Sequence, residues 1–232
     1  MSNGELFLKR FNELEHALRE RAGLGPDASF TDLVKTAAEK DSTVRRRKEI
    51  LRSIGRLRNA IVHDRQYPER ILADPRKEVI EELESVLAAI IKPKTLIPTF
   101  QRSIHIFTAE DALADCLGYM KEHDFSQVVL NLDGKHMLLS SEGIVKWLEN
   151  ARDVGLADLE QATVRDAWEY ENKNICQYLP RNAPIDAVYE AFEQAIGQGI
   201  PRLQAVLITH SGRPEERPLG IVTPWDLLSK VP

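Results

Sequence analysis

Three residues in the stretch GRLRNAIVHD, residues 55–64, carry side chains that can act on a phosphate group. The guanidinium of Arg58 can hold a phosphate through two parallel hydrogen bonds, and the imidazole of His63 can exchange a proton near neutral pH. At about 100° per helical residue, Arg58 falls within the apolar stripe of its own helix. Asn59 and His63 lie on an adjoining basic face. The segment therefore combines a residue that can bind phosphate, Arg58, with one that can act as an acid or base, His63.

The place of Arg58 in an apolar stripe leaves two explanations open. A buried guanidinium is costly unless a negative charge and hydrogen bonds compensate it. We therefore expect Arg58 to have an anionic partner. That partner is either a carboxylate of another helix, for example Glu13, Glu15 or Glu82, or a phosphate of another molecule.

A second candidate site is the tetrapeptide TPWD, residues 223–226, which follows an apolar segment. Pro224 suits the first turn of a helix, where unpaired N–H groups and the positive dipole end favour a phosphate. Thr223 offers a hydroxyl, and the carboxylate of Asp226 can accept hydrogen bonds from the two hydroxyls of a ribose. The alternative is local: Thr223 caps the helix, and Asp226 stabilises its first turn.

Charge is distributed unevenly along the chain. The net charge is −5, yet residues 1–95 are net basic and the remainder is net acidic. The stretch 44–58 alone holds seven basic residues and one acid. Such a surface either faces solvent or binds a polyanion such as RNA. In the second case the RNA-binding residues would be Arg45, Arg46, Arg47, Arg52 and Arg56.

Helical periodicity and its terminators predict that residues 1–95 form an all-α bundle. Apolar residues recur at helical spacing, and glycine or proline separates the segments. Ser29 or Thr31 can cap the second helix. The expected helices cover about residues 5–22, 32–40, 43–63 and 75–91.

From residue 100 onward, short β-rich segments alternate with helices. The order strand, helix, strand, strand, helix occurs twice, over about residues 100–150 and 172–232. An internal repeat of this length indicates two copies of one supersecondary unit. The predicted fold class is therefore α+β, with an N-terminal all-α helical bundle (1–95) followed by a pair of β-α-β-β-α repeats (100–232).

The pair of repeats resembles tandem cystathionine-β-synthase-type (CBS) domains. The resemblance is carried by APIDAVYEAFEQAIGQGIPRLQAVLI and PLGIVTPWDLLSKV in the second copy, and more faintly by TAEDALADCLGYMKEHDFSQVVL and HMLLSSEGIVKWL in the first. It implies an adenine nucleotide, such as AMP, ATP or a related ligand, bound at Thr223 and Asp226. The aligned residues of the first copy are Ser140 and Gly143. Ser140 is thus a candidate contact, but the ribose-binding acid is missing, which favours one site per chain.

The sequence RNAIVH, residues 58–63, with its helical surroundings resembles the R-x4-H signature of the HEPN family (higher eukaryotes and prokaryotes nucleotide-binding) over about residues 1–92. The resemblance implies either a metal-independent endoribonuclease acting as a dimer or an inactive domain for dimerisation or partner binding. In the first case the catalytic residues would be Arg58 for the phosphate, His63 as acid or base, and Asn59 beside them.

Two hypotheses follow for the whole chain. The first is an RNA-binding protein or endoribonuclease regulated by an adenine nucleotide; the second is a non-enzymatic nucleotide sensor whose helical domain is a platform for dimerisation or partner binding. Both require no metal and favour a homodimer. A cytoplasmic, non-membrane location is expected, because no apolar run approaches about 20 residues and residues 1–11 lack a signal-peptide core. Cys116 and Cys176 match no metal spacing and are expected to be free, buried thiols.

Overall fold

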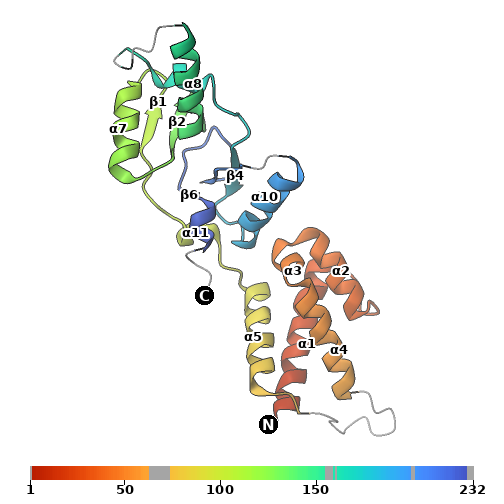
Figure 1. The fold of residues 1–232 in the computed structure, drawn as a ribbon. Coiled ribbons are helices and arrows are strands. Elements are labelled where there is room, and N and C mark those ends of the chain that lie inside the picture. The colour runs from red at the N-terminus through yellow and green to blue at the C-terminus, as the bar shows by residue number, and fades with distance from the viewer. Residues whose placement is uncertain (1, 63–73, 155–158, 160, 200–201, 229–232) are drawn as a thin grey trace. The chain divides into compact units, whose positions relative to one another are not determined.

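The computed structural model describes residues 2–62, 74–154, 159, 161–199 and 202–228. Contacts divide the chain into two compact units, Met1–Lys94 with Pro184–Ala187, and Thr95–Ala183 with Val188–Pro232. We call them the helical unit and the sheet unit. The helices α1–α5 belong to the first, and both three-stranded sheets belong to the second (Figure 1). The predicted α+β class is confirmed.

Helix α1, Asn3–Ala22, forms the long first helix of the helical unit. Ser2 and Glu5 exchange hydrogen bonds in a capping box, and Gly23, at φ 68°, ends the helix in the left-handed conformation. Its apolar face, which includes Phe7 and Phe11, packs in one core with the helices that follow it. These are α2 (Phe30–Lys40), α3 (Ser42–Arg46), α4 (Lys48–Val62) and α5 (Lys77–Ile91).

The third predicted helix is divided in the structure. Arg47, at φ −101° and ψ 11°, leaves helical geometry and separates α3 from α4. The guanidinium of Arg47 donates to the carbonyl oxygen of Thr43 at 3.0 Å, which ties the break to the preceding turn. A single periodicity runs through both helices, so the break left no signal in the sequence. The predicted end at His63 lies outside the described residues.

The sheet unit contains the predicted strand and helix order in both repeats. The first repeat comprises β1 (Ile106–Thr108), α7 (Leu113–His123), β2 (Gln127–Leu132), β3 (Lys135–Ser140) and α8 (Ser141–Val154). The second comprises β4 (Cys176–Pro180), α10 (Asp186–Gly197), β5 (Ala205–Thr209), β6 (Gly220–Val222) and α11 (Pro224–Leu228). In each sheet the first two strands are parallel and the last two antiparallel.

Two short helices, α6 (Leu96–Thr99) and α9 (Val164–Trp168), were not predicted. Thr163 and Asp166 form a capping box that begins α9. Ala112 forms an isolated bridge with Thr163, directly before α7 begins at Leu113. A pairing across 51 positions cannot be seen in helical periodicity.

The two repeats share a small apolar core. It joins Val129 and Leu138 of the first repeat to Ile175, Ala205 and Leu207 of the second. Strands of both repeats therefore pack together, and Val129 of this core also lines the site described below.

Among the described residues, no helix is both long and apolar enough to span a bilayer. Cys116 and Cys176 are free thiols, the first buried and the second partly buried, and burial raises the pKa of each to about 12. Within the same residues, no group of three or more His, Cys, Asp or Glu side chains is placed to hold a metal ion.

Candidate functional site

The turn between β6 and α11 holds Thr223 and Asp226 in a capping arrangement. The backbone N–H and the hydroxyl of Thr223 both donate to Oδ2 of Asp226 at 2.8 Å. The backbone N–H of Asp226 in turn donates to the carbonyl oxygen of Thr223 at 3.1 Å. The capping role that the sequence suggested for Thr223 and Asp226 is thus present, and these hydrogen bonds fix the direction of the Asp226 carboxylate.

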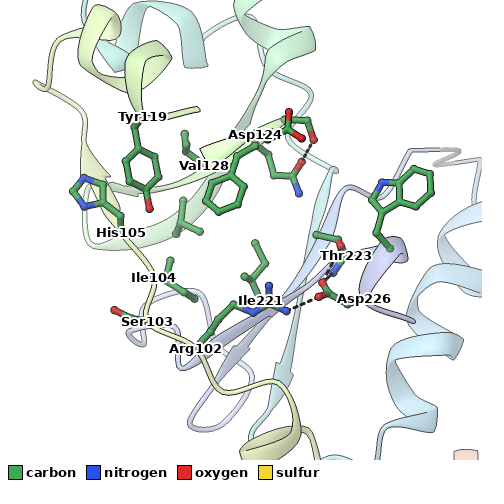
Figure 2. A pocket seen from close by; sticks show the side chains of 15 residues that line it. Arg102, Ser103, Ile104, His105, Tyr119, Asp124, Val128, Ile221, Thr223 and Asp226 are labelled. Atoms are coloured by element: carbon green, nitrogen blue, oxygen red, sulfur yellow. Dashed lines mark hydrogen bonds and ion pairs between the residues drawn. The ribbon is translucent and has the colours of Figure 1, made fainter. Parts of the chain in front are cut away.

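The other oxygen of this carboxylate meets Arg102, which precedes β1. Nη2 of Arg102 donates to Oδ1 of Asp226 at 2.6 Å, as Figure 2 shows. Partial burial tends to raise the pKa of Asp226, but the hydrogen bonds from Thr223 and Arg102 outweigh that effect, and its pKa is lowered. Asp226 is consequently ionised at neutral pH and presents a negative charge beside the guanidinium of Arg102.

Asp226 and Arg102 border a cavity of about 290 Å³. Its apolar lining comes from both repeats, with Ile104, Val128 and Val129 from the first and Ile221 from the second. Trp225 stands at the edge of the cavity and is 77% exposed. The remaining lining residues are Ser103, His105, Tyr119, Asp124, Phe125, Ser126, Gln127 and Thr223. A cavity that combines apolar and aromatic side chains with convergent polar groups is typical of small-molecule sites.

An aromatic cluster forms one wall, to which His105, Tyr119 and Phe125 contribute. The ring of Tyr119 lies 4.7 Å from the ring of His105, 4.3 Å from that of His123 and 6.0 Å from that of Phe125, measured between centroids. In Figure 2, His105 and Tyr119 lie across the cavity from Asp226. Aromatic side chains and a charged group that line the same cavity suit a ligand with a planar part and a polar part.

The equivalent turn of the first repeat is organised differently. Ser140 ends β3, and its N–H and hydroxyl donate to Oε2 of Glu171 at 2.6 and 2.7 Å. Position 143 has no acid, as expected. The carboxylate of Glu171 takes its place and accepts the hydrogen bonds from Ser140. Ser140 is 2% exposed and Glu171 is 6% exposed. With its hydroxyl engaged inside the fold, Ser140 is not retained as a ligand contact.

In the helical unit, Arg58 is half-buried over an aromatic ring. Its guanidinium carbon lies 5.7 Å from the centroid of Phe11, and Nη1 donates to Oδ1 of Asn59 at 3.3 Å. Within the described residues it forms no ion pair, and Glu13 and Glu15 pair with Arg10 and Arg19 instead. Of the two partners considered for Arg58, a carboxylate is therefore not found among the described residues, and its contacts there are the ring of Phe11 and the amide of Asn59. His63 lies outside the described residues.

Arg58 and Asn59 border a hollow of about 470 Å³ between α1, α2 and α4. Phe11 and Phe30, whose ring centroids are 4.7 Å apart, contribute aromatic surface to it. The other lining residues are Glu15, Ala28, Ser29, Thr31, Val34, Arg52, Gly55 and Arg56. Three arginines and one glutamate give the hollow an excess of positive charge.

The remaining predicted RNA-binding residues do not line this hollow. Arg45 donates to the carbonyl oxygens of Ala38 and Glu39 at the end of α2, and Arg47 donates to that of Thr43. Arg46 lies in the last turn of α3. Only Arg52 and Arg56 of the predicted set are brought together with Arg58.

Sequence reasoning missed Arg102, Glu171 and the aromatic wall. Arg102 is 124 positions from Asp226, and Glu171 is 31 positions from Ser140. Neither carries a local motif that could have indicated its partner. The aromatic residues at 119, 123 and 125 do lie close together in the sequence, on the end of one helix and the turn after it.

No family model matches the chain, and no curated protein matches it. Among solved structures, Hypoxic Response Protein I with two coordinated zinc ions is 23% identical, with a TM-score of 0.43 over 60% of this chain and 100% of that one. The CBS domain pair of protein MJ0100, in complex with 5-methylthioadenosine and S-adenosyl-L-methionine, is 15% identical, with a TM-score of 0.43 over 59% and 94%. The CBS domain of a membrane protein from Sphaerobacter thermophilus is 15% identical, with a TM-score of 0.45 over 67% and 99%. Two of these three structures are described as CBS domains.

Proposed function

We propose that this chain is a regulatory protein that senses an adenine nucleotide through a CBS-type pair in residues 100–232. The observation that carries the proposal is the cavity beside Asp226, where an ionised carboxylate, a guanidinium and aromatic side chains face one space. Residues 1–95, with their HEPN-like motif, form the part through which the sensor acts, and the working unit is a homodimer.

Each part of an adenine nucleotide has a complementary group in this cavity. The ribose hydroxyls donate to Oδ1 of Asp226, and the base packs against the apolar lining and the wall around Tyr119. The phosphate binds Arg102, whose forked donors suit phosphate oxygens. Thr223 keeps the Asp226 carboxylate aimed at the ribose through its two hydrogen bonds.

Binding in this mode requires Arg102 to leave Asp226. The side chain of Arg102 then turns from Asp226 to the phosphate, so the ion pair between these two residues is replaced by contacts that each of them makes with the ligand. A ligand shifts a conformational equilibrium only by binding one state better than another. This exchange of contacts supplies such a difference.

Calorimetry with AMP, ATP and S-adenosylmethionine tests the proposal on the full chain. Asp226→Asn is expected to weaken binding about tenfold or more, since a charged hydrogen bond contributes about 1.5–3 kcal/mol. Asp166→Asn is a matched control, because Asp166 Oδ2 accepts from the N–H and hydroxyl of Thr163 at 2.8 Å, as Asp226 does from Thr223, but lies outside the cavity. Binding of none of the three probes by the wild type, or equal losses in both variants, would reject it.

The hollow in the helical unit favours a second candidate function, the binding of single-stranded RNA. Arg52, Arg56 and Arg58 can contact phosphates, while the partly exposed Phe30 offers a ring beside them. Stacking of bases on aromatic rings next to cations is a common mode of single-strand binding. Metal-independent cleavage would further require His63 as the acid or base.

RNA binding and cleavage are tested with a labelled single-stranded oligonucleotide. Arg58→Gln is expected to weaken binding several-fold, whereas Lys35→Gln, which removes the same charge from an exposed position of α2, should not. Cleavage should disappear in His63→Ala. If the wild type neither binds nor cleaves the RNA, the platform hypothesis is left, and sedimentation of the full chain then decides whether it forms a dimer.

A further inference from the structure

The two repeats use the same hydrogen bonds at the same turn but take the acid from different places. In the second repeat the acid is Asp226, three residues after Thr223. In the first it is Glu171, 31 residues after Ser140, and its Oε2 accepts from the same two kinds of donor. The position three residues after Ser140 is Gly143.

The side chain of Glu171 occupies the space beside Gly143. A Cβ atom at position 143 would lie 2.4 Å from Oε2 of Glu171, closer than any side chain tolerates. The N–H of Gly143 donates to Oγ of Ser140 at 3.2 Å, and Oγ itself donates to Glu171. Gly143 and Glu171 are therefore linked: an acid can reach Ser140 from position 143 or from position 171, but not from both.

Burial separates the two acids. Glu171 is 6% exposed, and its other oxygen, Oε1, accepts from the N–H of Asn172 at 2.8 Å. The side chain of Asp226 is 20% exposed and lines a cavity. Glu171 thus accepts from the N–H and hydroxyl of Ser140 and from the N–H of Asn172, all within the fold, so no ligand is needed to complete this turn.

We propose that Glu171 is a built-in closure of a latent second ligand site, and that it sets the stoichiometry at one nucleotide per chain. This inference rests on the proposed function. The latent site is the turn after Ser140, and the ligand that it would accept is the ribose of the same adenine nucleotide. By supplying the acid from inside the fold, Glu171 completes the turn while withholding its carboxylate from solvent.

An exchange of the two acids tests the closure. Glu171→Ala removes the internal acid, Gly143→Asp places an acid beside it, and the double variant leaves only the acid at the position that Asp226 has in the second repeat. We expect each single variant to lower the melting temperature by roughly 4–8 °C. The double variant should recover part of that loss, since the crowding is removed and the hydrogen bonds to Ser140 are restored.

Calorimetry with AMP then counts the sites. One nucleotide per chain is expected for the wild type and two for the double variant, of which Asp226→Asn should remove one. Two sites in the wild type, one site in a recovered double variant, or a double variant less stable than both single variants would overturn the closure. If AMP binds neither protein, the proposed function fails with AMP as ligand, and the melting temperatures still decide whether the acids are exchangeable.

Discussion

Arg102 and Asp226 form an ion pair across 124 positions of the chain, with 2.6 Å between Nη2 and Oδ1. The side chain of Arg102 is 41% exposed, and pairs of such exposure contribute only about 0–1 kcal/mol to stability. A ligand hydroxyl can therefore displace Arg102 at low cost. The pair holds the carboxylate in position without closing the cavity.

Removal of this cation should change which ligands bind. In Arg102→Ala, adenosine is expected to bind up to about fivefold more tightly, because its ribose no longer competes with Arg102 for Asp226. AMP is expected to bind about tenfold more weakly, because its phosphate loses a charged donor. Calorimetry on both ligands measures the ratio. Arg213→Ala, which removes an exposed arginine paired with Glu216, is the control, and equal changes for adenosine and AMP would contradict the assignment.

Trp225 should report occupation of the cavity. It is 77% exposed and lines the cavity, whereas Trp147 belongs to the buried core of the first repeat and Trp168 packs against that core. Addition of AMP is expected to shift or quench the tryptophan emission. Trp225→Phe should lose that response and retain binding by calorimetry. An unchanged response in this variant would place the ligand elsewhere.

Stability should depend on the ionisation of Asp226 at acid pH. Because its folded pKa is lowered below the ordinary value of 3.8, its contribution to stability is complete above that value and is lost as the pH falls through the lower, folded pKa. Denaturant unfolding of the wild type and Asp226→Asn from pH 6 down to pH 2 measures this. The difference in unfolding free energy should shrink below about pH 4. If the difference in unfolding free energy instead grew toward low pH, the pKa of Asp226 would be raised in the folded state, which would contradict the prediction.

Two glycines in helices should respond to alanine in opposite directions. A Cβ at Gly55 of α4 would lie 2.8 Å from Cδ1 of Phe30, so Gly55→Ala must displace a ring that packs on Phe11 and is expected to destabilise the chain by about 1–3 kcal/mol. A Cβ at Gly118 of α7 meets nothing within 4 Å, and Gly118→Ala should stabilise by up to about 1 kcal/mol. Chemical denaturation of both variants provides the comparison. If Gly55→Ala were as stabilising as Gly118→Ala, the contact with Phe30 would be incorrect.

Local sequence patterns predicted the elements that local hydrogen bonds determine, namely most helices, the strand order and the cap at Thr223. Helical spacing located α1, α2 and α5, and the repeated strand and helix order located both sheets. Thr223 and Asp226 could be paired because they are three residues apart at the start of a helix. The break at Arg47 could not be predicted, since the apolar periodicity of the two helices continues across it.

Contacts between segments that are distant in the chain could not be predicted from the sequence. The helical angle of Arg58 indicated a position near apolar side chains, but not that its neighbour would be the ring of Phe11 on α1. Gly143 showed that the first repeat lacks an acid at this position, yet Glu171 lies 31 residues after Ser140 and has no motif of its own. Such residues become visible only when the strands and turns that carry them have been placed.

The tetrapeptide pattern Thr-x-x-Asp occurs at the start of both α9 and α11, with the same two hydrogen bonds of 2.8 Å from threonine to aspartate. A motif search would score the two copies alike. What separates them is the second oxygen of the acid, which at Asp226 meets a cation at the edge of a cavity. In tetrapeptides of this type, one carboxylate oxygen caps the helix in both copies. The surroundings of the other oxygen are therefore a better criterion than the motif for recognising a ligand site.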